Sequence, residues 1–284
     1  QKFSLKYLLN KNILITGAGG SIGSELSKQI VFNKPKTLLL LDHSEYFLYR
    51  THEELISLKN KFNLDVNFKF FLGSIQNTNF LNNIFYNNKI QMVFHAAAYK
   101  HVPILEQNII EGVCNNVFGT YEIIKASIKF NVSKFLLISS DKAVKPTNVM
   151  GATKRLAELL CHSYNSYKIK TKFSVVRFGN VLNSSGSVIP LFKKQISNGG
   201  PVTVTDRNVD RFFMTTNEAI KLVLKTIEIS KGGEIFLLNM GKPIKILDLA
   251  KKMIHLSGAN YYLDNKENEK RPGDIEIKIV GLRS

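Results

Sequence analysis

The stretch that decides the fold is residues 12–23, which read NILITGAGGSIG. Its first five residues are an apolar run that predicts a short buried strand, and residues 21–31 continue with a helical pattern. A second apolar run, residues 37–41, predicts another strand and ends on Asp42. A strand, a glycine turn, a helix, a strand and an acid in this order are typical of a dinucleotide-binding unit.

The glycine spacing departs from the usual fingerprint of such units. Gly17, Gly20 and Gly23 give G-x-x-G-x-x-G rather than G-x-G-x-x-G, and glycine turns also occur at plain strand-to-helix corners. The strands on both sides favour nucleotide binding. We therefore expect these glycines, with Ser21 and Ile22, to hold a pyrophosphate at the positive end of the helix.

Asp42 decides between the two nicotinamide cofactors. A carboxylate at this position accepts hydrogen bonds from the ribose hydroxyls and repels a 2′-phosphate. His43 and Ser44 follow it, so no arginine stands next to it to bind such a phosphate. The sequence favours NAD over NADP; a helix cap is the alternative role for Asp42.

The other expected cofactor contacts lie at the ends of the next two predicted strands, residues 68–73 and 91–97, or directly after them. A helix around 79–86 is predicted between these strands. The contacts are Ser74 and Ile75, which would border the adenine, and Ala96, Ala97 and Ala98, whose small side chains let a nucleotide lie against the backbone. Lys100 and His101 come next and are candidates for substrate phosphates, although a lone lysine or histidine there is more often simply solvated.

The candidate catalytic residues follow a predicted strand at residues 134–140. Ser140, Asp141 and Lys142 leave the strand end together, and Met150 and Lys154 share one face of the helix that comes next. Polar groups at the carboxyl end of a strand are where α/β sheets place their chemistry. The alternative is an ordinary strand-to-helix turn with Asp141 as a cap and two solvated lysines.

Composition limits the class of protein. At 284 residues, with 44% hydrophobic and 21% charged residues, the chain has the composition of a soluble globular protein of about two domains. No apolar run is long enough to span a membrane, and no secretory signal opens the chain. Cys114 and Cys161 are far apart and lack a metal-like spacing, so we expect no disulfide and no metal site.

The formal net charge of +17 raises the question of nucleic acid. The lysines are scattered among asparagines and isoleucines rather than gathered in a block, so we expect no nucleic-acid partner. A basic surface also suits an anionic ligand or a position beside a membrane.

The regular strand-helix alternation fades after a predicted strand at residues 172–178. Asn180 and Val181 follow that strand, and Arg207 and Arg211 lie on an irregular segment; such arginines suit a diphosphate through bidentate contacts. An ion-pair cluster with Asp206 and Asp210 is the alternative. The elements expected in this part are strands at 202–205 and 234–239, helices at 218–229 and 246–256, and a charged loop at 262–274.

Five stretches of the chain together resemble one family. They are residues 15–26 (ITGAGGSIGSEL), 95–103 (HAAAYKHVP), 141–155 (DKAVKPTNVMGATKR), 176–182 (VRFGNVL) and 211–215 (RFFMT). They are similar to the nucleotide-sugar 4,6-dehydratases of the polysaccharide-biosynthesis (CapD/WbpM/PglF-like) group, within the extended short-chain dehydrogenase/reductase superfamily. The resemblance covers almost the whole chain.

The resemblance implies an α/β fold with a doubly wound parallel sheet of the Rossmann type and a small C-terminal substrate-binding domain. We expect residues 1–178, with 212–240 returning, to form the NAD-binding domain, and residues 179–211 with 241–284 to form the substrate-binding part. The last motif, which ends at residue 284, is shorter than in the relatives, so a truncated C-terminus is expected.

The resemblance also implies UDP-N-acetylglucosamine as substrate, bound NAD and a 4-keto-6-deoxy product. Most of the superfamily has a tyrosine four residues before the lysine, where this chain has Met150, and a thioether cannot exchange a proton. The same replacement marks the long-form relatives, whose dehydratases retain the configuration at C5. The expected product is therefore UDP-2-acetamido-2,6-dideoxy-α-D-xylo-hexos-4-ulose, made for bacterial surface glycan or protein glycosylation.

Roles carried over by resemblance are a general acid at Asp141 and a base at Lys142. Ser140 is expected to hydrogen-bond the sugar 4-hydroxyl, directly or through a water, and Lys154 to bind the nicotinamide ribose. Relatives also imply a homodimer or higher homo-oligomer. We expect a cytoplasmic location, at the inner face of the cell membrane where the full-length protein is tethered through a region absent here.

Two other functions stay open. Some relatives without the tyrosine bind a dinucleotide only to signal, which would make the chain a non-catalytic NAD-sensing regulator. A nucleotide-sugar 4-epimerase would share the cofactor but needs no acid-base pair for C5 and C6. Loss of water from the substrate separates the dehydratase from both.

Overall fold

A computed structural model describes residues 5–165, 167, 169–182, 187–263 and 274–281. The chain divides into two compact units. The first unit comprises residues 1–178 and 217–238, and the second comprises residues 179–216 and 239–284. Residues 212–216 and 239–240, which we expected to return to the first domain, thus fall in the second unit.

The first unit is built on a seven-stranded sheet in the order β11-β6-β5-β4-β1-β2-β3, with every pair of neighbours parallel. Its strands are β1 (Asn12–Thr16), β2 (Thr37–Asp42), β3 (Asn67–Leu72), β4 (Met92–His95), β5 (Lys134–Ser140), β6 (Lys172–Phe178) and β11 (Ile235–Leu237). The order reverses between β1 and β4, which is the switch point of a doubly wound sheet. The predicted fold class is confirmed.

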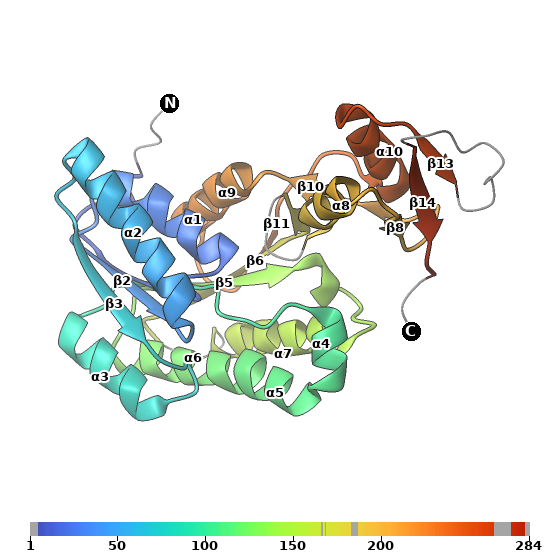
Figure 1. Cartoon of the computed structure of the whole chain (residues 1–284). Helices are drawn as coiled ribbons and strands as arrows, with labels where there is room; N and C mark the ends of the chain where they lie inside the picture. Colours follow the sequence, from blue (N-terminus) through green and yellow to red (C-terminus); the bar gives the residue numbers. More distant parts are fainter. Residues whose placement is uncertain (1–4, 166, 168, 183–186, 264–273, 282–284) are drawn as a thin grey trace. The chain divides into compact units, whose positions relative to one another are not determined.

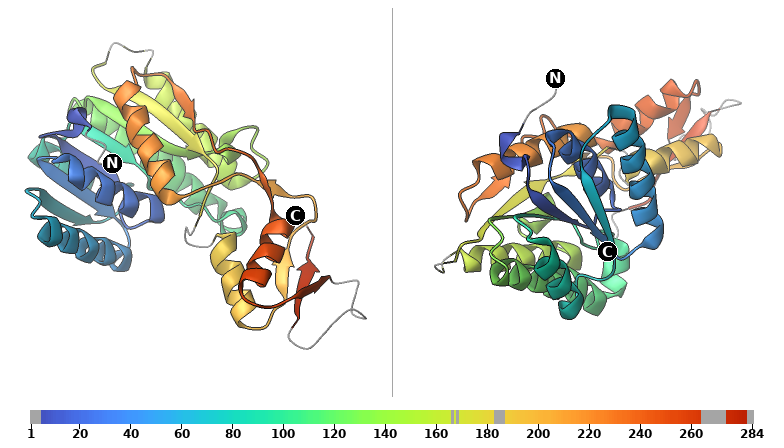
Figure 2. Two further views of the ribbon diagram at one scale, coloured as in Figure 1. Left: turned by 90° about the horizontal axis from the view of Figure 1, so that it is seen from above. Right: turned by 90° about the vertical axis from the view of Figure 1, so that its left-hand side faces the viewer.

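Helices cover both faces of this sheet. They are α1 (Ser21–Ile30), α2 (Glu45–Phe62), α3 (Thr78–Asn88), α4 (Val102–Gln107), α5 (Ile109–Val113), α6 (Gly119–Lys129), α7 (Val149–Tyr164) and α9 (Thr216–Ile229). Figures 1 and 2 show α1, α2 and α9 over one face and α3, α5, α6 and α7 over the other. Because both faces are covered, the central strands are continuous apolar runs, as the sequence indicated.

The core of the first unit lies between the sheet and the second layer of helices. Leu14 and Leu39 of the sheet pack in one cluster with Phe85 of α3, Ile123 of α6 and Ala157 of α7, and all five are fully or almost fully buried. This packing holds the strands in place, so that their carboxyl ends lie along one edge of the sheet.

Several boundaries differ from the sequence prediction. Residues 116–130 predict an amphipathic helix. In the structure it begins earlier, as α5, and runs through a π-helical turn, Cys114–Phe118, into α6. The strand expected at 91–97 is shorter, because residues 96–98 leave the sheet. Helix α2 was not predicted; only Leu48, Thr51 and Leu55 of it are buried, so its apolar periodicity is weak.

The second unit has a small core of its own. A three-stranded parallel sheet in the order β13-β14-β8 packs with two helices, and Phe192, Val202, Ala250 and Ile277 are completely buried there. Its elements are β7 (Asn180–Val181), α8 (Val188–Ser197), β8 (Val202–Val204), β9 (Asp210–Arg211), β10 (Phe213–Met214), β12 (Ile244–Lys245), α10 (Ile246–Leu256), β13 (Tyr261–Leu263) and β14 (Ile275–Ile279).

The charged loop expected at 262–274 is partly wrong, because residues 262–263 belong to β13; residues 264–273 lie outside the described part. Helix α8 and strand β14 were not predicted. Within the described ranges, no helix combines the length and apolar character needed to cross a membrane.

Candidate active site

The turn between β1 and α1 leaves no room for a side chain at Gly17, Gly19 or Gly23. Gly17 has φ +67°, and a Cβ added there would lie 2.6 Å from the backbone nitrogen of Ala97. A Cβ on Gly23 would lie 2.1 Å from the carbonyl oxygen of Gly17. Gly17 therefore permits the close approach of the segment that follows β4, and Gly23 lets α1 begin against the turn.

A pocket of about 260 Å³ opens beside this turn. Its lining comes from the ends of four strands, the start of α2 and the π-helical turn before α6: Gly17, Gly20, Leu41, Asp42, His43, Ser44, Phe47, Gly73, Ser74, Ile75, Ala96, Ala97, Ala98, Tyr99 and Asn115. The structure thus brings Gly17, Gly20, Asp42, Ser74, Ile75 and the three alanines together around one cavity. Ser21, Ile22 and Gly23 do not line it but form the first turn of α1 beside it.

The carboxylate of Asp42 is fixed in orientation. It is only 7% exposed, and it accepts hydrogen bonds from the backbone N–H of Gly19 (2.8 Å, to Oδ2) and of Ser44 (2.9 Å, to Oδ1). A carboxylate has about four lone-pair sites, so each oxygen can still accept a further hydrogen bond. Ser44, not Asp42, caps α2, which argues against the alternative role of Asp42 as the cap.

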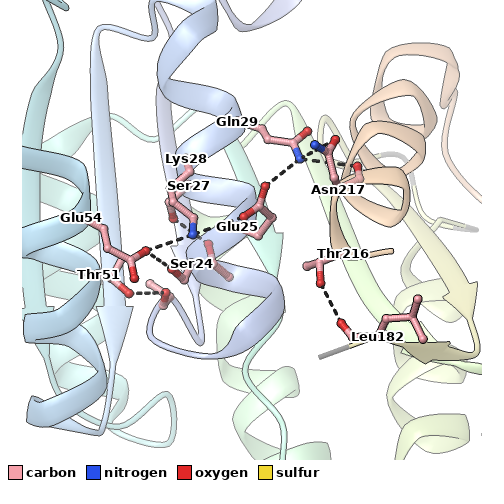
Figure 3. A network of polar contacts seen from close by, with 12 residues as sticks. Ser24, Glu25, Ser27, Lys28, Gln29, Thr51, Glu54, Leu182, Thr216 and Asn217 are labelled. Atoms are coloured by element: carbon pink, nitrogen blue, oxygen red, sulfur yellow. Dashed lines mark hydrogen bonds and ion pairs between the residues drawn. The ribbon is translucent and has the colours of Figure 1, made fainter. Parts of the chain in front are cut away.

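Helix α2 is held against α1 by a network of polar contacts on the face of the sheet that both helices cover (Figure 3). Lys28 of α1 pairs with Glu25 at 3.2 Å and with Glu54 of α2 at 3.0 Å, and Ser24 donates to the same Glu54 carboxylate. Thr51 of α2 donates to the carbonyl of Ala18 in the glycine turn. These contacts keep the pocket-lining start of α2 in place over the turn.

Phe47 and Asn115 are two of the lining residues that were not among the expected cofactor contacts. Phe47 packs so closely on the glycine turn that a Cβ added to Gly19 would lie 2.6 Å from the Cβ of Phe47. Asn115 lies in the π-helical turn, and π turns inside α-helices often mark functional sites. Neither position carries a signal in the sequence, because α2 and the π turn were not predicted.

The predicted catalytic turn forms at the end of β5, which is two strands away from β1 in the sheet. Asp141 and Lys142 begin a 3₁₀ turn, Asp141–Ala143. The Ser140 hydroxyl donates to Asp141 Oδ1 at 2.9 Å and accepts from the backbone N–H of Lys142 at 3.2 Å. Lys142 Nζ lies 3.5 Å from the same Asp141 oxygen, and both side chains are about one third exposed. The three residues therefore form one connected, accessible group.

Cations gather near this turn. Desolvation and the positive charge of Lys142 lower the pKa of Lys100, and desolvation and Lys100 in turn lower the pKa of His101. His101 is the residue before α4 and is exposed. The loop after β4 and the turn after β5 thus bring their positive charges close together.

Met150 and Lys154 lie on the buried face of α7, at 4% and 7% exposure. Lys154 Nζ donates to the carbonyl oxygen of Ile138 at 2.6 Å. Burial lowers the pKa of Lys154 to about 8, although the charge of Glu158 opposes the shift. Lys154 does not line the pocket beside the glycine turn.

Asn116, which the sequence analysis had not singled out, connects three segments of the site. Its side chain bonds the backbone N–H and carbonyl of Tyr99, at 2.8 and 3.0 Å, and donates to Thr153 Oγ1 at 3.0 Å. The loop after β4 is thereby fastened to the helix that carries Met150 and Lys154.

His95 is buried at the end of β4 and has a structural role. Its ring nitrogens contact Thr16 Oγ1 at 2.6 Å and Thr120 Oγ1 at 2.8 Å. Complete burial, with the charge of Lys154, lowers its pKa to about 3, so the ring is neutral.

The remaining predicted residues belong to the second unit. Asn180 and Val181 form β7 and pair with β10, while Arg207 and Arg211 are exposed. Arg211 donates to the carbonyl oxygen of Asp210, and neither arginine forms an ion pair with a described residue. The alternative of an ion-pair cluster with Asp206 and Asp210 is therefore not supported.

Residues 13–284 match the protein family described as "Polysaccharide biosynthesis protein". The chain belongs to this family. The capsular polysaccharide biosynthesis protein CapD of Staphylococcus aureus is 47% identical over 276 residues, which are 97% of this chain and 44% of CapD. The chain therefore spans less than half the length of that relative.

A second member of the comparison carries an enzyme name. The UDP-N-acetylglucosamine 4,6-dehydratase (inverting) of Campylobacter jejuni is 36% identical over 244 residues, which are 84% of this chain and 70% of that protein. The resemblance to this polysaccharide-biosynthesis group, inferred from the motifs, is confirmed.

Solved structures share the fold. The X-ray structure of Pen from Bacillus thuringiensis has a TM-score of 0.84 and 39% identity, covering 97% of this chain and 81% of that one. DesIV, a dTDP-glucose 4,6-dehydratase from Streptomyces venezuelae solved with NAD and TYD bound, has a TM-score of 0.79 at 18% identity, over 95% of this chain and 85% of that one. The second likeness shows the common fold alone.

Proposed function

We propose that this family member is a NAD-dependent UDP-N-acetylglucosamine 4,6-dehydratase, a hydro-lyase that retains the configuration at C5. The observation that carries the proposal is the pairing of Asp141 with Lys142, an acid and an amine 3.5 Å apart on an accessible turn at the carboxyl edge of the sheet. Elimination of water needs one group to protonate the leaving hydroxyl and another to remove a proton. The enzyme name of the Campylobacter jejuni relative supports the same loss of water, although that relative is named as an inverting enzyme and retention is proposed here.

The pocket beside the glycine turn fits NAD. The cradle at Gly17 has no room for a side chain, and the fixed carboxylate of Asp42 has acceptor sites left for two ribose hydroxyls. A cofactor held there would supply a hydride acceptor for sugar C4 and then a hydride donor for C6, so that the reaction has no net redox change. The carboxylate of Asp42 would repel the 2′-phosphate of NADP.

The Asp141–Lys142 pair holds one exchangeable proton that serves both catalytic steps. When the two residues form an ion pair, the proton is on Lys142. To act as a general acid and a general base, they need that proton on Asp141. Lys142 then takes the C5 proton while Asp141 protonates the departing 6-hydroxyl, so that water leaves. Lys142 returns a proton to C5 when the hydride is added to C6. The pair recovers its initial state by taking one proton from solvent, which replaces the proton that the sugar 4-hydroxyl loses on oxidation.

Ser140 and Lys154 are proposed to orient the sugar and the cofactor. The Ser140 hydroxyl uses its proton toward Asp141 and one lone pair toward Lys142 N–H, so its second lone pair can accept from the sugar 4-hydroxyl. Lys154 spends one of its three donors on Ile138 and keeps two for the nicotinamide ribose. Lys100 and His101 are proposed to meet the substrate phosphates.

Retention at C5 rests on Met150. Its thioether cannot handle the alcohol proton as a tyrosine does, which leaves Ser140 for that contact.

In the second unit, Asn180, Val181, Arg207 and Arg211 are proposed to bind the UDP part. The homo-oligomer also remains part of the proposal, and the half-exposed leucines of α7, Leu156 and Leu159, are candidates for its contacts.

Incubation with UDP-N-acetylglucosamine tests the proposal. Mass spectrometry should show a product lighter by one water, and NMR should show the original configuration at C5. Asp141→Asn and Lys142→Ala should each lower kcat by about 10²–10⁴-fold, because each removes one proton-transfer group. A product of unchanged mass would instead indicate an epimerase, and unchanged turnover in both folded variants would refute the assigned roles.

A further inference from the structure

Glu106 makes an unusual contact between two helices of the first unit. It lies on α4, the helix that follows Lys100 and His101, and its side chain is exposed. Its Oε1 nonetheless accepts a hydrogen bond of 2.7 Å from the backbone N–H of Val149, the first residue of α7, which is 43 residues away in the chain.

This bond completes the cap of α7. Asn148 accepts from the N–H of Gly151 at 2.8 Å through its side chain, and the first bond within the helix runs from Ala152 N–H to the Asn148 carbonyl at 3.0 Å. The N–H of Val149 has no partner inside the helix, as at every helix start. The Glu106 carboxylate supplies that partner and adds a negative charge at the positive end of the helix.

The start of α7 is also in contact with the catalytic turn. A Cβ on Gly151 would lie 2.3 Å from the carbonyl oxygen of Lys142 and 3.1 Å from Cβ of Pro146. No side chain separates the helix from the backbone of Lys142, so a shift of the first turn of α7 moves that backbone directly. Met150 lies in the same turn and is buried.

We propose that Glu106 is a positioning residue for the reaction: by holding the first turn of α7, it fixes the backbone of Lys142 and thereby the place of the catalytic pair. The inference rests on the proposed dehydratase function. Glu106 does not touch the reacting atoms; it links the loop after β4 to the turn after β5 through α7.

Three variants test this role in the full chain. Glu106→Ala removes the acceptor, and Glu106→Gln keeps an oxygen that can accept the same bond. Glu111→Ala is the matched control, because Glu111 is exposed on the neighbouring α5 and its side chain has no hydrogen bond or ion pair with the described residues. The readouts are kcat and KM for UDP-N-acetylglucosamine, the affinity for NAD, and amide hydrogen exchange at residues 149–152 without any ligand.

We expect Glu106→Ala to lower kcat by about 10- to 100-fold, because a displacement of about 1 Å at the reacting groups costs up to about 10²-fold. NAD affinity should stay close to the wild-type level, since the pocket beside the glycine turn does not involve α7. Lys154, the α7 residue proposed to meet the nicotinamide ribose, is held separately by its bond to Ile138. Exchange at Val149 should be faster in Glu106→Ala but not in Glu106→Gln or Glu111→Ala, and Glu106→Gln should recover most of the kcat.

Two results would overturn the inference while leaving the proposed function intact. One is a kcat in Glu106→Ala equal to that of Glu111→Ala, and the other is an equal loss of kcat in Glu106→Gln and Glu106→Ala. Unchanged exchange at Val149 in Glu106→Ala overturns the inference whether or not the wild type turns over. Failure of the wild-type protein to release water from the substrate is a different outcome, which refutes the proposed function itself.

Discussion

Replacing Glu158 by Gln should destabilise the first unit strongly, because this carboxylate is completely buried and holds several partners. Its Oε1 accepts from Ser139 Oγ at 2.6 Å and from Arg177 Nε at 2.7 Å. Its Oε2 accepts from Arg155 at 3.1 Å and from the second nitrogen of Arg177. Helix α7 is thereby joined to β5 and β6 directly beneath the catalytic turn.

The magnitude follows from what is left behind. Glutamine has the same shape, but it carries no charge and points an N–H₂ group at a guanidinium that cannot accept it. Arg177 is only 16% exposed, so its charge stays largely buried without a partner. Breaking a buried ion pair in this way costs about 3–5 kcal/mol. For a unit of this size, that corresponds to a fall of roughly 6–20 °C in Tm.

Thermal unfolding followed by circular dichroism measures the effect, with Ser139→Ala as the control. Ser139→Ala removes a single hydrogen bond to the same carboxylate and should cost only about 0.5–1.5 kcal/mol. If Glu158→Gln is no less stable than Ser139→Ala at pH 7, the buried carboxylate does not stabilise the unit as argued here.

The difference between wild type and Glu158→Gln should also depend on pH. Burial by itself raises the pKa of Glu158, but hydrogen bonds from Arg177, Ser139 and Arg155 outweigh it and hold the pKa below its ordinary value. A depressed pKa in the folded state stabilises the fold above the unfolded pKa of about 4.3, and this stabilisation is lost as the pH falls through the folded pKa. The gap in stability should therefore be constant above about pH 5 and should narrow at more acidic pH.

Two further predictions concern the cofactor pocket. Gly17→Ala should weaken NAD binding by at least about tenfold, because the positive φ costs about 1–2 kcal/mol and the new Cβ overlaps the backbone of Ala97. Titration calorimetry measures the affinity, and a wild-type value would show that the turn does not hold the pyrophosphate. Asp42→Asn should lower NAD affinity by about 1.5–3 kcal/mol and narrow the preference for NAD over NADP, because it removes a charged acceptor and the repulsion of a 2′-phosphate. An unchanged ratio of the two affinities would exclude Asp42 from cofactor selection.

The parts of the fold that the sequence predicted are those with a strong local pattern. Strand β5 matched its predicted limits because residues 135–138 are an unbroken apolar run that is buried on both faces. Helix α2 was missed because its exposed face carries Tyr46 and Tyr49, which blur the apolar periodicity. In the second unit, the apolar residues of α8 and β14 are buried in one cluster that also contains residues of β8 and α10. A short window of sequence does not contain these contacts, so α8 and β14 were missed.

The site shows the same division. For β1 and β5 the sequence predicted which residues would follow the strand, because that depends on where an apolar run ends. For β4 it placed Ala96 and Ala97 inside the strand, which ends at His95. It did not predict that the backbone of Gly19 and Ser44 would orient Asp42, or that Glu106 would cap a helix begun 43 residues later. Such contacts depend on the packing of whole elements, and a single polar residue on a helix surface carries no sign of its distant partner.

The strand order explains how the cofactor pocket and the proposed acid-base residues can share one site although they are more than 100 residues apart in sequence. Strand β4 pairs with both β1 and β5, so the glycine turn after β1 and the Asp141–Lys142 turn after β5 lie at the same edge of the sheet, two strand spacings apart. At about 4.8 Å per spacing this separation is roughly 10 Å. Between them lie Ala96–Ala98, whose small side chains leave the edge open along its length. A dinucleotide held by its pyrophosphate at the glycine turn can thus extend across β4 toward the acid-base pair, and larger side chains at these alanines would block it.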